Sequence, residues 1–183
     1  LTGIAASKYV QPSGSCYDLG CSVGASTFVI DQATLGTDCS IYGIDSSLPM
    51  IEECSSQLRG QFSSRVNLVC SDIREVEIVD ASFVVLNLTL QFIPQPERLK
   101  VLANIYEGMQ PGSALLLSEK IKLKDVKRND NYIKWYYDFK RATIMDPTHG
   151  WEMTVAHVLR GEFVRAVSPA RIDRDTFLSK LER

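Results

Sequence analysis

The sequence has few of the residues that mark metal sites, disulfide frameworks and membrane spans. It contains two histidines, His149 and His157, and neither stands near acids and cysteines at the spacing of metal ligands. Its five cysteines are an odd number and include no Cys-x-x-Cys pair, which favours reduced thiols over a disulfide framework or a zinc site. No apolar run is long enough to cross a bilayer, so we expect no membrane span and no secretory leader. These absences predict a cytoplasmic protein without a metal centre.

An excess of charge of one sign is also missing. The sequence has 20 lysines and arginines and 22 acids, which gives a net charge of −2. This net charge provides no electrostatic basis for binding nucleic acid. With 45% hydrophobic and 23% charged residues, the composition is that of an ordinary globular protein. The sequence shows no internal repeat, low-complexity tract or linker, and its 183 residues suit one domain. We therefore predict a single domain over residues 1–183.

Apolar runs alternate with helical segments through the first two thirds of the chain. Strands are expected at Ser15–Leu19, Ser40–Asp45, Val66–Cys70, Ser82–Asn87 and Ala114–Ser118. Helices are expected at Leu1–Val10, about Ala25–Leu35, Pro49–Leu58 and Pro96–Gly108. Strands that are apolar on both faces and alternate with helices predict an α/β fold with a doubly wound, mostly parallel sheet.

The last third of the chain gives a weaker pattern. Four lysines lie within Lys120–Lys127, and a probable helix follows that carries the aromatic side chains of Tyr132, Trp135, Tyr136, Tyr137 and Phe139. Lysines beside aromatics are compatible with a nucleic-acid surface, but we favour solvated lysines followed by an aromatic stripe that faces the core. Residues 143–183 are predicted to form a mainly helical tail.

The most informative segment runs from Asp18 to Gly24. An acid closes the first strand, Gly20 begins a tight turn, and Gly24 stands where a helix begins. Glycine lets backbone approach a ligand closely, and the free N–H groups of a helix N-terminus favour a carboxylate or another polar group. Such a loop can bind a nucleotide-like cofactor through Gly20, Cys21 and Ser22, although strand–glycine–helix turns are also plain structural devices. Cys21 stands at a helix N-terminus, which can lower a thiol pKa; we interpret it as a small residue that fits the loop.

Other polar residues follow the next strands. Asp45, with Ser46 beside it, ends the second strand about 25 residues past Gly20, near the spacing at which an acid binds ribose hydroxyls. Asp72 and Ile73 follow the third strand, where a carboxylate can meet an adenine amino group and an apolar side chain can cover the ring. Asn87 ends the fourth strand and is expected to face the reacting centre. Each acid alone can be a helix cap or a turn residue, but successive strand ends favour a ligand crevice.

Several stretches together are similar to one family. They are Tyr17–Ser22, Ser71–Arg74, Leu86–Phe92 (Leu-Asn-Leu-Thr-Leu-Gln-Phe), Leu117–Lys120 and Asp138–Ala142 (Asp-Phe-Lys-Arg-Ala). They resemble the carboxy-S-adenosylmethionine synthases of bacterial wobble-uridine tRNA modification, in unbroken order from Leu1 to about Ala142. The Asn-x-Thr-Leu-Gln-Phe and Phe-Lys-Arg-Ala stretches carry most of the resemblance, because they are not general features of methyltransferases.

The resemblance implies a class I methyltransferase fold, a homodimer, and a reaction of S-adenosylmethionine with prephenate that gives carboxy-S-adenosylmethionine and phenylpyruvate. It implies cofactor contacts from Gly20, Cys21, Ser22, Asp45, Ser46, Asp72, Ile73 and Asn87. A partner enzyme, not this one, would carry the new group to tRNA, so no direct nucleic-acid binding is expected. The chemistry needs an arginine to hold the new carboxylate. Position along the chain suggests Arg160, with Arg165 next.

The sequence departs from the family at both ends. The resemblance leads us to expect that the family's N-terminal lid and the last strands of the fold are lacking, and the residues after Ala142 do not follow the family pattern. Two other interpretations stay open, because residues at strand ends do not separate carboxyl from methyl transfer and because the lid and tail are missing. One is ordinary methyl transfer from S-adenosylmethionine to a small acceptor, and the other is a non-catalytic module that binds the cofactor.

Overall fold

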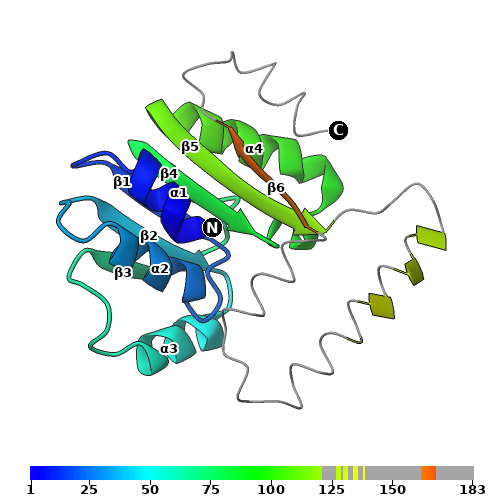
Figure 1. Ribbon diagram of the computed structural model, residues 1–183, viewed down its shortest axis with the longest axis horizontal. Coiled ribbons are helices and arrows are strands. Elements are labelled where there is room, and N and C mark those ends of the chain that lie inside the picture. Colours follow the sequence, from blue (N-terminus) through cyan, green and yellow to red (C-terminus); the bar gives the residue numbers. More distant parts are fainter. Residues whose placement is uncertain (121–126, 129, 132–133, 136–137, 139–161, 168–183) are drawn as a thin grey trace. The chain divides into compact units, whose positions relative to one another are not determined.

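The computed structural model describes residues 1–120, 127–128, 130–131, 134–135, 138 and 162–167 of the chain (Figure 1). Its helices are α1 (Thr2–Tyr9), α2 (Ala25–Ala33), α3 (Leu48–Gln57), the 3-10 turn η1 (Leu90–Phe92) and α4 (Gln95–Gly108). Its strands are β1 (Ser15–Leu19), β2 (Ser40–Asp45), β3 (Val66–Cys70), β4 (Ala81–Asn87), β5 (Met109–Lys120) and β6 (Glu162–Val167). The alternation of strands and helices through β5 confirms the predicted α/β class.

The six strands form one sheet in the order β3-β2-β1-β4-β5-β6. β1 pairs in parallel with both β2 and β4, and β2 pairs in parallel with β3. The chain therefore adds β2 and β3 on one side of β1. It then crosses back over the sheet and adds β4, β5 and β6 on the other side of β1. The carboxyl ends of β1 and β4 stand side by side where the winding changes direction, which is the place where open α/β sheets bind ligands.

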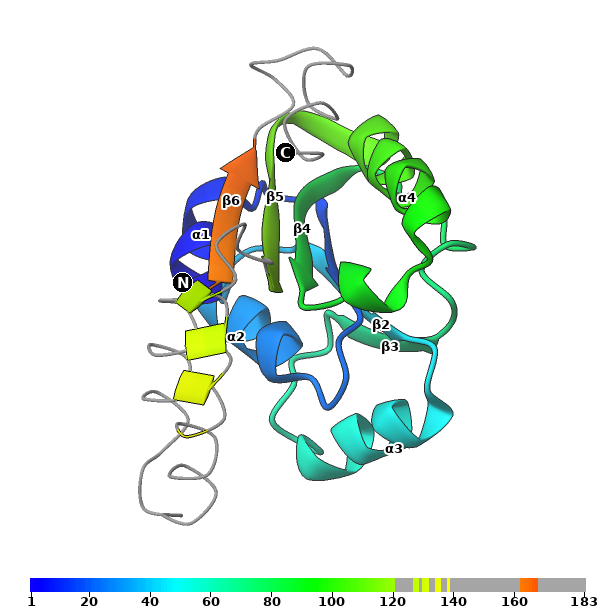
Figure 2. The same ribbon diagram turned by 90° about the vertical axis from the view of Figure 1, so that its right-hand side faces the viewer.

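Helices cover both faces of the sheet. α1 and α2 lie on one face and α4 lies on the other (Figures 1 and 2). β4 is buried from Ala81 to Leu86 because helices pack on both of its faces. Its side chains join those of the neighbouring strands and α4 in the main hydrophobic core, which includes Leu19, Val84, Leu86, Ile105 and Leu115. Gly108 ends α4 against the backbone of Ile78, where a Cβ would collide with the Ile78 carbonyl.

The structure differs from the expectations for the later part of the chain at three places. β5 begins at Met109, five residues before the expected Ala114, because the strand continues through Pro111–Gly112 with a positive φ of 82° at Gly112. Residues 162–167 form a strand beside β5, so the tail is not helical there and the sheet does gain a later strand. Trp135 is 42% exposed and does not belong to a stripe that faces the core. The other four aromatics of that cluster lie outside the described residues.

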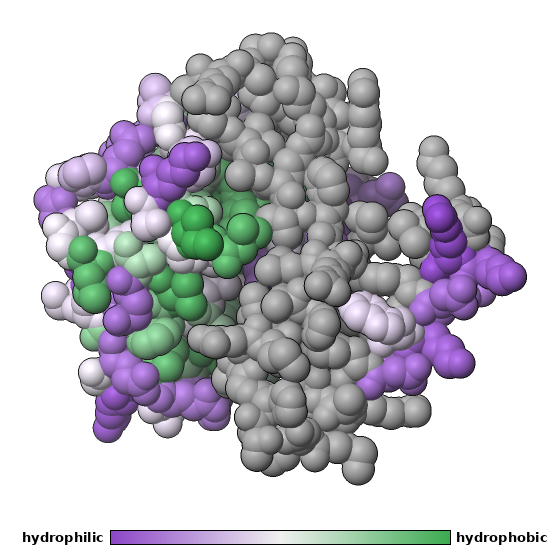
Figure 3. Space-filling model, viewed as in Figure 1, coloured by the Kyte–Doolittle hydropathy of each residue, from purple (hydrophilic) through white to green (hydrophobic). Residues whose placement is uncertain are grey.

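Contacts group the chain into two compact units, Leu1–Leu117 with Arg165–Arg183, and Ser118–Val164. The single domain over 1–183 stays a prediction. In the first unit the outer side of α1 and α2 carries apolar surface (Figure 3), to which Ile4, Val29 and Leu35 contribute. Among the described residues, no helix is both long and apolar enough to span a membrane.

Candidate functional site

The parallel register brings the predicted site residues to one edge of the sheet. Leu19 of β1 pairs with Ile44 of β2, and Asp45 pairs with Cys70 at the end of β3. Because neighbouring strands run in the same direction, their following loops leave from the same edge. The order along this edge is the loop after β3 with Asp72, then Asp45 at the end of β2, then Gly20–Ser22, then Asn87 at the end of β4. We call this the carboxyl edge.

The loop after β1 is held down by β2. The N–H groups of Gly20 and Cys21 both donate to the Ile44 carbonyl, at 2.8 and 2.9 Å, and Gly24 N–H donates to Cys21. Gly20 has a φ of 82°, and a Cβ there would collide with the side chain of Thr89. Because the N–H groups of Gly20, Cys21 and Gly24 are used inside the protein, they are not available to an anionic ligand.

Asp18 binds a residue in the first turn of α2 from below the loop. This carboxylate is 1% exposed and accepts the hydroxyl of Thr27 at 2.6 Å, as well as the backbone N–H of Thr27 in the first turn of α2. Burial, with a smaller contribution from the charge of Asp45, raises the pKa of Asp18 to about 6. Asp18 thus anchors α2 to the end of β1 from beneath the loop.

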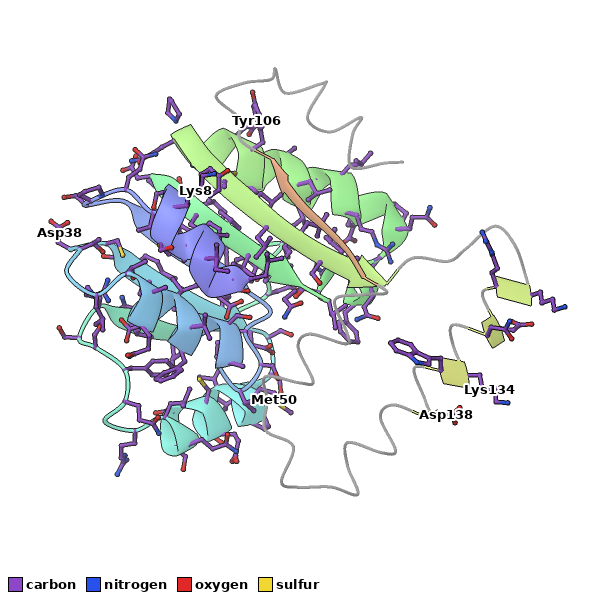
Figure 4. All side chains as sticks on the ribbon, in the orientation of Figure 1. Lys8, Asp38, Met50, Tyr106, Lys134 and Asp138 are labelled. Atoms are coloured by element: carbon purple, nitrogen blue, oxygen red, sulfur yellow. The ribbon has the colours of Figure 1, made fainter. Side chains whose placement is uncertain are left out.

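Asp45 joins two loops of the carboxyl edge. Its Oδ2 accepts the N–H of Ser22 at 2.9 Å, and its Oδ1 accepts the N–H of Ser47 at 2.9 Å. A carboxylate has about four lone-pair sites, so about one remains open on each oxygen. Ser22 is exposed with a φ of 50°, and its hydroxyl contacts the sulfur of Met50 at 3.7 Å (Met50 is labelled in Figure 4). Ser46, next to Asp45, is exposed.

Asp72 is part of an ion-pair cluster with Arg74 and Glu97. The Arg74 side chain donates to both oxygens of Asp72, and its other terminal nitrogen donates to Glu97 of α4 at 2.5 Å. These hydrogen bonds lower the pKa of Asp72. Ile73 is 5% exposed and lies in the main core. Its place over an adenine ring stays a prediction. The sequence pattern did not identify Arg74 and Glu97 as partners of Asp72, although the Asp-x-Arg spacing is compatible with a local ion pair.

The end of β4 combines an exposed polar side chain with a constrained backbone. Asn87 is exposed, and Leu88 after it has a φ of 59°, which is unfavourable for a branched side chain. Thr89 is buried, and its hydroxyl donates to the Leu19 carbonyl at 2.8 Å, which links the loop after β4 to the end of β1. The backbone at the ends of β1 and β4 is therefore fixed on both sides of the winding reversal. Thr89 was also missed, since its partner is 70 residues away in the sequence.

Cys21 does not have the pKa that its position at a helix N-terminus suggests. Burial, and next the charge of Asp18, raise the pKa of this thiol. Cys21 is 5% exposed, which agrees with its interpretation as a small packing residue. Arg160, both histidines and the remaining family stretch at Phe139–Ala142 lie outside the described residues, and Arg165 lies in β6. The described part of the chain holds no group of acids, histidines and cysteines that could bind a metal.

Comparison with known proteins gives the family. A family model described as a methyltransferase domain matches residues 17–112, from the middle of β1 through β4 to the start of β5. The chain belongs to this methyltransferase family. The match covers the whole carboxyl edge, from the glycine loop to Asn87.

Among similar proteins are two named carboxy-S-adenosyl-L-methionine synthase. One, from Trichlorobacter lovleyi, is 46% identical over 143 residues, which is 76% of this chain and 58% of that protein. The other, from Idiomarina loihiensis, is 50% identical over 139 residues, 74% of this chain and 57% of that protein. The chain thus spans less than two thirds of the length of these relatives.

Solved structures agree on the fold. The cyclopropane synthase MmaA2 of Mycobacterium tuberculosis gives a TM-score of 0.58 at 17% identity, over 70% of this chain and 45% of that one. The mitomycin 7-O-methyltransferase MmcR gives 0.55 at 20% identity, over 68% of this chain and 36% of that one. At these identities the likeness shows a methyltransferase fold and nothing finer.

Proposed function

We propose that this methyltransferase-fold chain binds S-adenosylmethionine at the carboxyl edge and transfers a carboxyl group to it from prephenate. The products are carboxy-S-adenosylmethionine and phenylpyruvate. The observation that carries the proposal is the 44–50% identity to proteins named carboxy-S-adenosyl-L-methionine synthase.

The polar groups of the carboxyl edge fit this ligand. The open lone-pair sites of Asp45, about one on each oxygen, match two vicinal ribose hydroxyls, each of which donates one hydrogen bond. Since the N–H groups of Gly20, Cys21 and Ser22 bond within the protein, this loop suits a cationic ammonium group better than a diphosphate. Gly20, Cys21 and Ser22 then contact the methionine part, with Ser46 beside the ribose and Asp72 and Ile73 at the adenine.

The protein's part in the reaction is to position the two substrates and exclude water. In the balanced step, the carboxyl group of prephenate replaces one hydrogen of the sulfonium methyl group. Prephenate becomes aromatic as its hydroxyl leaves, and that hydroxyl combines with the displaced proton to form water. Asn87 faces the reacting carbon, where the backbone at Leu88 and Thr89 is fixed. Arg160 holds the new carboxylate through paired N–H donors.

The resemblance to carboxy-S-adenosylmethionine synthases supports a wider setting for the same proposal. The enzyme is a homodimer in the cytoplasm, and its product serves a partner enzyme that modifies the wobble uridine of tRNA. The net charge of −2 agrees with small-molecule substrates and with the absence of direct nucleic-acid binding.

The test is incubation of the purified chain with S-adenosylmethionine and prephenate, followed by mass spectrometry of the small molecules. A product heavier than S-adenosylmethionine by a carboxyl group in place of hydrogen, with an equal amount of phenylpyruvate, is expected. Conversion of S-adenosylmethionine to its demethylated form would contradict the proposal and indicate methyl transfer instead. Binding without turnover would leave a non-catalytic cofactor module.

Arg160 has a separate test in binding. Arg160→Ala should weaken carboxy-S-adenosylmethionine at least tenfold more than S-adenosylmethionine, because only the former carries the extra carboxylate. Arg59→Ala, at an exposed arginine next to α3, is the matched control. Equal weakening of both ligands by Arg160→Ala would remove Arg160 from this role.

A further inference from the structure

Two cysteines lie close together at the edge of the sheet opposite the carboxyl edge. Cys16 stands near the start of β1, where it pairs with Ile41 of β2, and Cys39 lies two residues before Ile41. Because alternate residues along a strand point to the same face, the two thiols lie on one face of the sheet. Both side chains are fully buried, and the Cys16 thiol donates a hydrogen bond to the Cys39 sulfur. The proposed reaction uses neither of them.

The Cys39 sulfur also accepts hydrogen bonds from a hydroxyl and a cation. The hydroxyl of Thr37 donates to it at 3.1 Å, and Nη1 of Arg65 donates to it at 3.2 Å. The hydrogen bond from Cys16, and next those from the nearby hydroxyls, lower the pKa of Cys39 to about 5. The contact with Cys39 and burial raise the pKa of Cys16. Cys39 is therefore the thiolate of the pair at neutral pH, and Cys16 stays a thiol.

The charges around the pair leave part of the Arg65 guanidinium for the sulfur. Asp31 of α2 accepts from Nη2 at 2.7 Å, and its carboxylate also accepts the N–H and the hydroxyl of Ser63, at 2.8 and 2.5 Å. Because Ser63 compensates part of the Asp31 charge, Nη1 on the other side of the guanidinium can stabilise negative charge on Cys39. The thiolate is the nucleophilic form of cysteine, so this surrounding favours reaction at Cys39.

We propose that Cys39 and Cys16 form an oxidation site, in which a peroxide oxidises Cys39 and Cys16 then closes a disulfide with it. The Cys39 thiolate attacks one oxygen of hydrogen peroxide, the O–O bond breaks, and a sulfenic acid forms as hydroxide leaves and takes a proton from solvent. The sulfur of Cys16 then attacks the sulfur of Cys39, and the leaving hydroxyl takes the Cys16 proton and departs as water. The two sulfurs together lose two electrons, which reduce the peroxide to two waters.

Peroxide reaches Cys39 through local opening of the segment before β2. Residues 37–39 belong to no helix or strand, and the neighbouring Asp38 is exposed (Figure 4). Such segments open at a lower free energy than strands in the core. Cys70, by contrast, is exposed in the closed protein. A comparison of Cys39 with Cys70 therefore separates the effect of a thiolate from the effect of exposure.

The experiment treats the reduced, purified chain with hydrogen peroxide at pH 6, blocks the remaining thiols with a maleimide and maps the peptides by mass spectrometry. Digestion before aspartates places Cys16, Cys21 and Cys39 in separate peptides, and trypsin separates Cys54 from Cys70. Cys39 should be oxidised about tenfold faster than Cys70, since few ordinary thiols are ionised at this pH. The Cys39 peptide should be recovered joined to the Cys16 peptide, with the loss of two hydrogens.

Variants separate the two steps. Cys16→Ser should stop at the first step, so that a 1,3-diketone traps the sulfenic acid of Cys39. Thr37→Val removes one donor to the sulfur and should slow oxidation of Cys39 several-fold. Cys54→Ser removes another buried thiol and is the matched control, in which the joined peptides should form as before. In concentrated urea the preference for Cys39 over Cys70 should be lost, because it depends on the folded structure.

The outcomes are independent of the proposed function, which concerns the opposite edge and is tested by its product. Oxidation of Cys70 ahead of Cys39 in the folded chain would overturn the inference, because exposure and not the thiolate would then decide the reaction. A sulfenic acid that persists on Cys39 of the unaltered chain, with no joined peptides, would overturn the role of Cys16.

Discussion

At the scale of single residues, Asp18 makes the stability of the protein depend on pH. Burial raises its pKa from 3.8 to about 6, so the folded state holds its proton more tightly than the unfolded state does. The contribution of Asp18 is therefore most favourable below pH 3.8 and is lost as pH rises through 6, by about 3 kcal/mol in total. Asp72 and Asp38, whose pKa values are lowered, act in the opposite direction.

Asp18→Asn isolates this effect, because an amide carries no charge and its oxygen still accepts from Thr27. The free energy of unfolding of Asp18→Asn minus that of the unaltered protein should increase from pH 4 to pH 7, by up to about 3 kcal/mol. Urea denaturation of both proteins at each pH measures the difference. A difference that stays constant over this range would show that Asp18 has an ordinary pKa.

Asp45 carries the ribose part of the proposal. Asp45→Ala should weaken S-adenosylhomocysteine by about 1–3 kcal/mol, because the ribose hydroxyls lose their acceptor. Asp38→Ala is the matched control, since Asp38 likewise accepts a serine N–H but stands near the opposite edge, before β2 (Figure 4). Calorimetry measures both. Equal affinities for Asp45→Ala and Asp38→Ala would refute the ribose role.

Alanine substitutions at Gly20 and Gly36 separate the cost of backbone strain from the cost of a steric collision. Both have a positive φ, of 82° and 90°, so alanine is strained by about 1–2 kcal/mol at either position. A Cβ at Gly36 meets nothing within 4 Å, whereas a Cβ at Gly20 collides with Thr89. Gly20→Ala should therefore lose about 1–3 kcal/mol more than Gly36→Ala in urea denaturation. Equal losses would mean that the Thr89 contact is not tight.

At the scale of elements, Arg65 ties the start of β3 to α2. Its guanidinium donates to the Asp31 carboxylate at 2.7 Å, and Asp31 is fully buried. Arg65→Met should lower the free energy of unfolding by about 3–5 kcal/mol, because it leaves a buried charge without its partner. Asp31→Asn together with Arg65→Met should recover part of this loss, since the charge is then gone as well. A double variant as unstable as Arg65→Met would indicate lost packing instead.

The same elements show what the sequence could predict. β1, β2 and β3 have the expected bounds, because each is a short apolar run closed by an acid, a glycine or a turn. The start of β5 was placed too late, since Pro111–Gly112 has the composition of a turn and only pairing with neighbours makes it strand. The positions of Asp45, Asp72 and Asn87 at strand ends followed from local pattern, whereas Thr89–Leu19 and Arg74–Glu97 join distant segments that no local pattern connects.

At the scale of the molecule, the two edges of the sheet have different roles. The amino edge, where β1, β2 and β3 begin, is bound internally by the Arg65–Asp31 pair and by the Asp38–Ser13 contacts. The carboxyl edge presents Asp45 with acceptor capacity left over, and Asn87 exposed. Ligand binding should thus alter hydrogen exchange at the carboxyl edge and leave hydrogen exchange at the amino edge unchanged.

Hydrogen exchange with mass spectrometry tests this division across the chain. S-Adenosylhomocysteine should slow exchange in peptides that cover residues 20–24, 45–47, 71–74 and 87–89, because bound ligand suppresses local opening there. Adenosine alone should protect 45–47 and 71–74 but not 87–89, since it lacks the amino-acid part that reaches toward β4. Peptides over residues 11–14 and 36–39 at the amino edge are the internal control. Protection spread equally over both edges would mean that the ligand stabilises the fold as a whole and does not bind where the strands end.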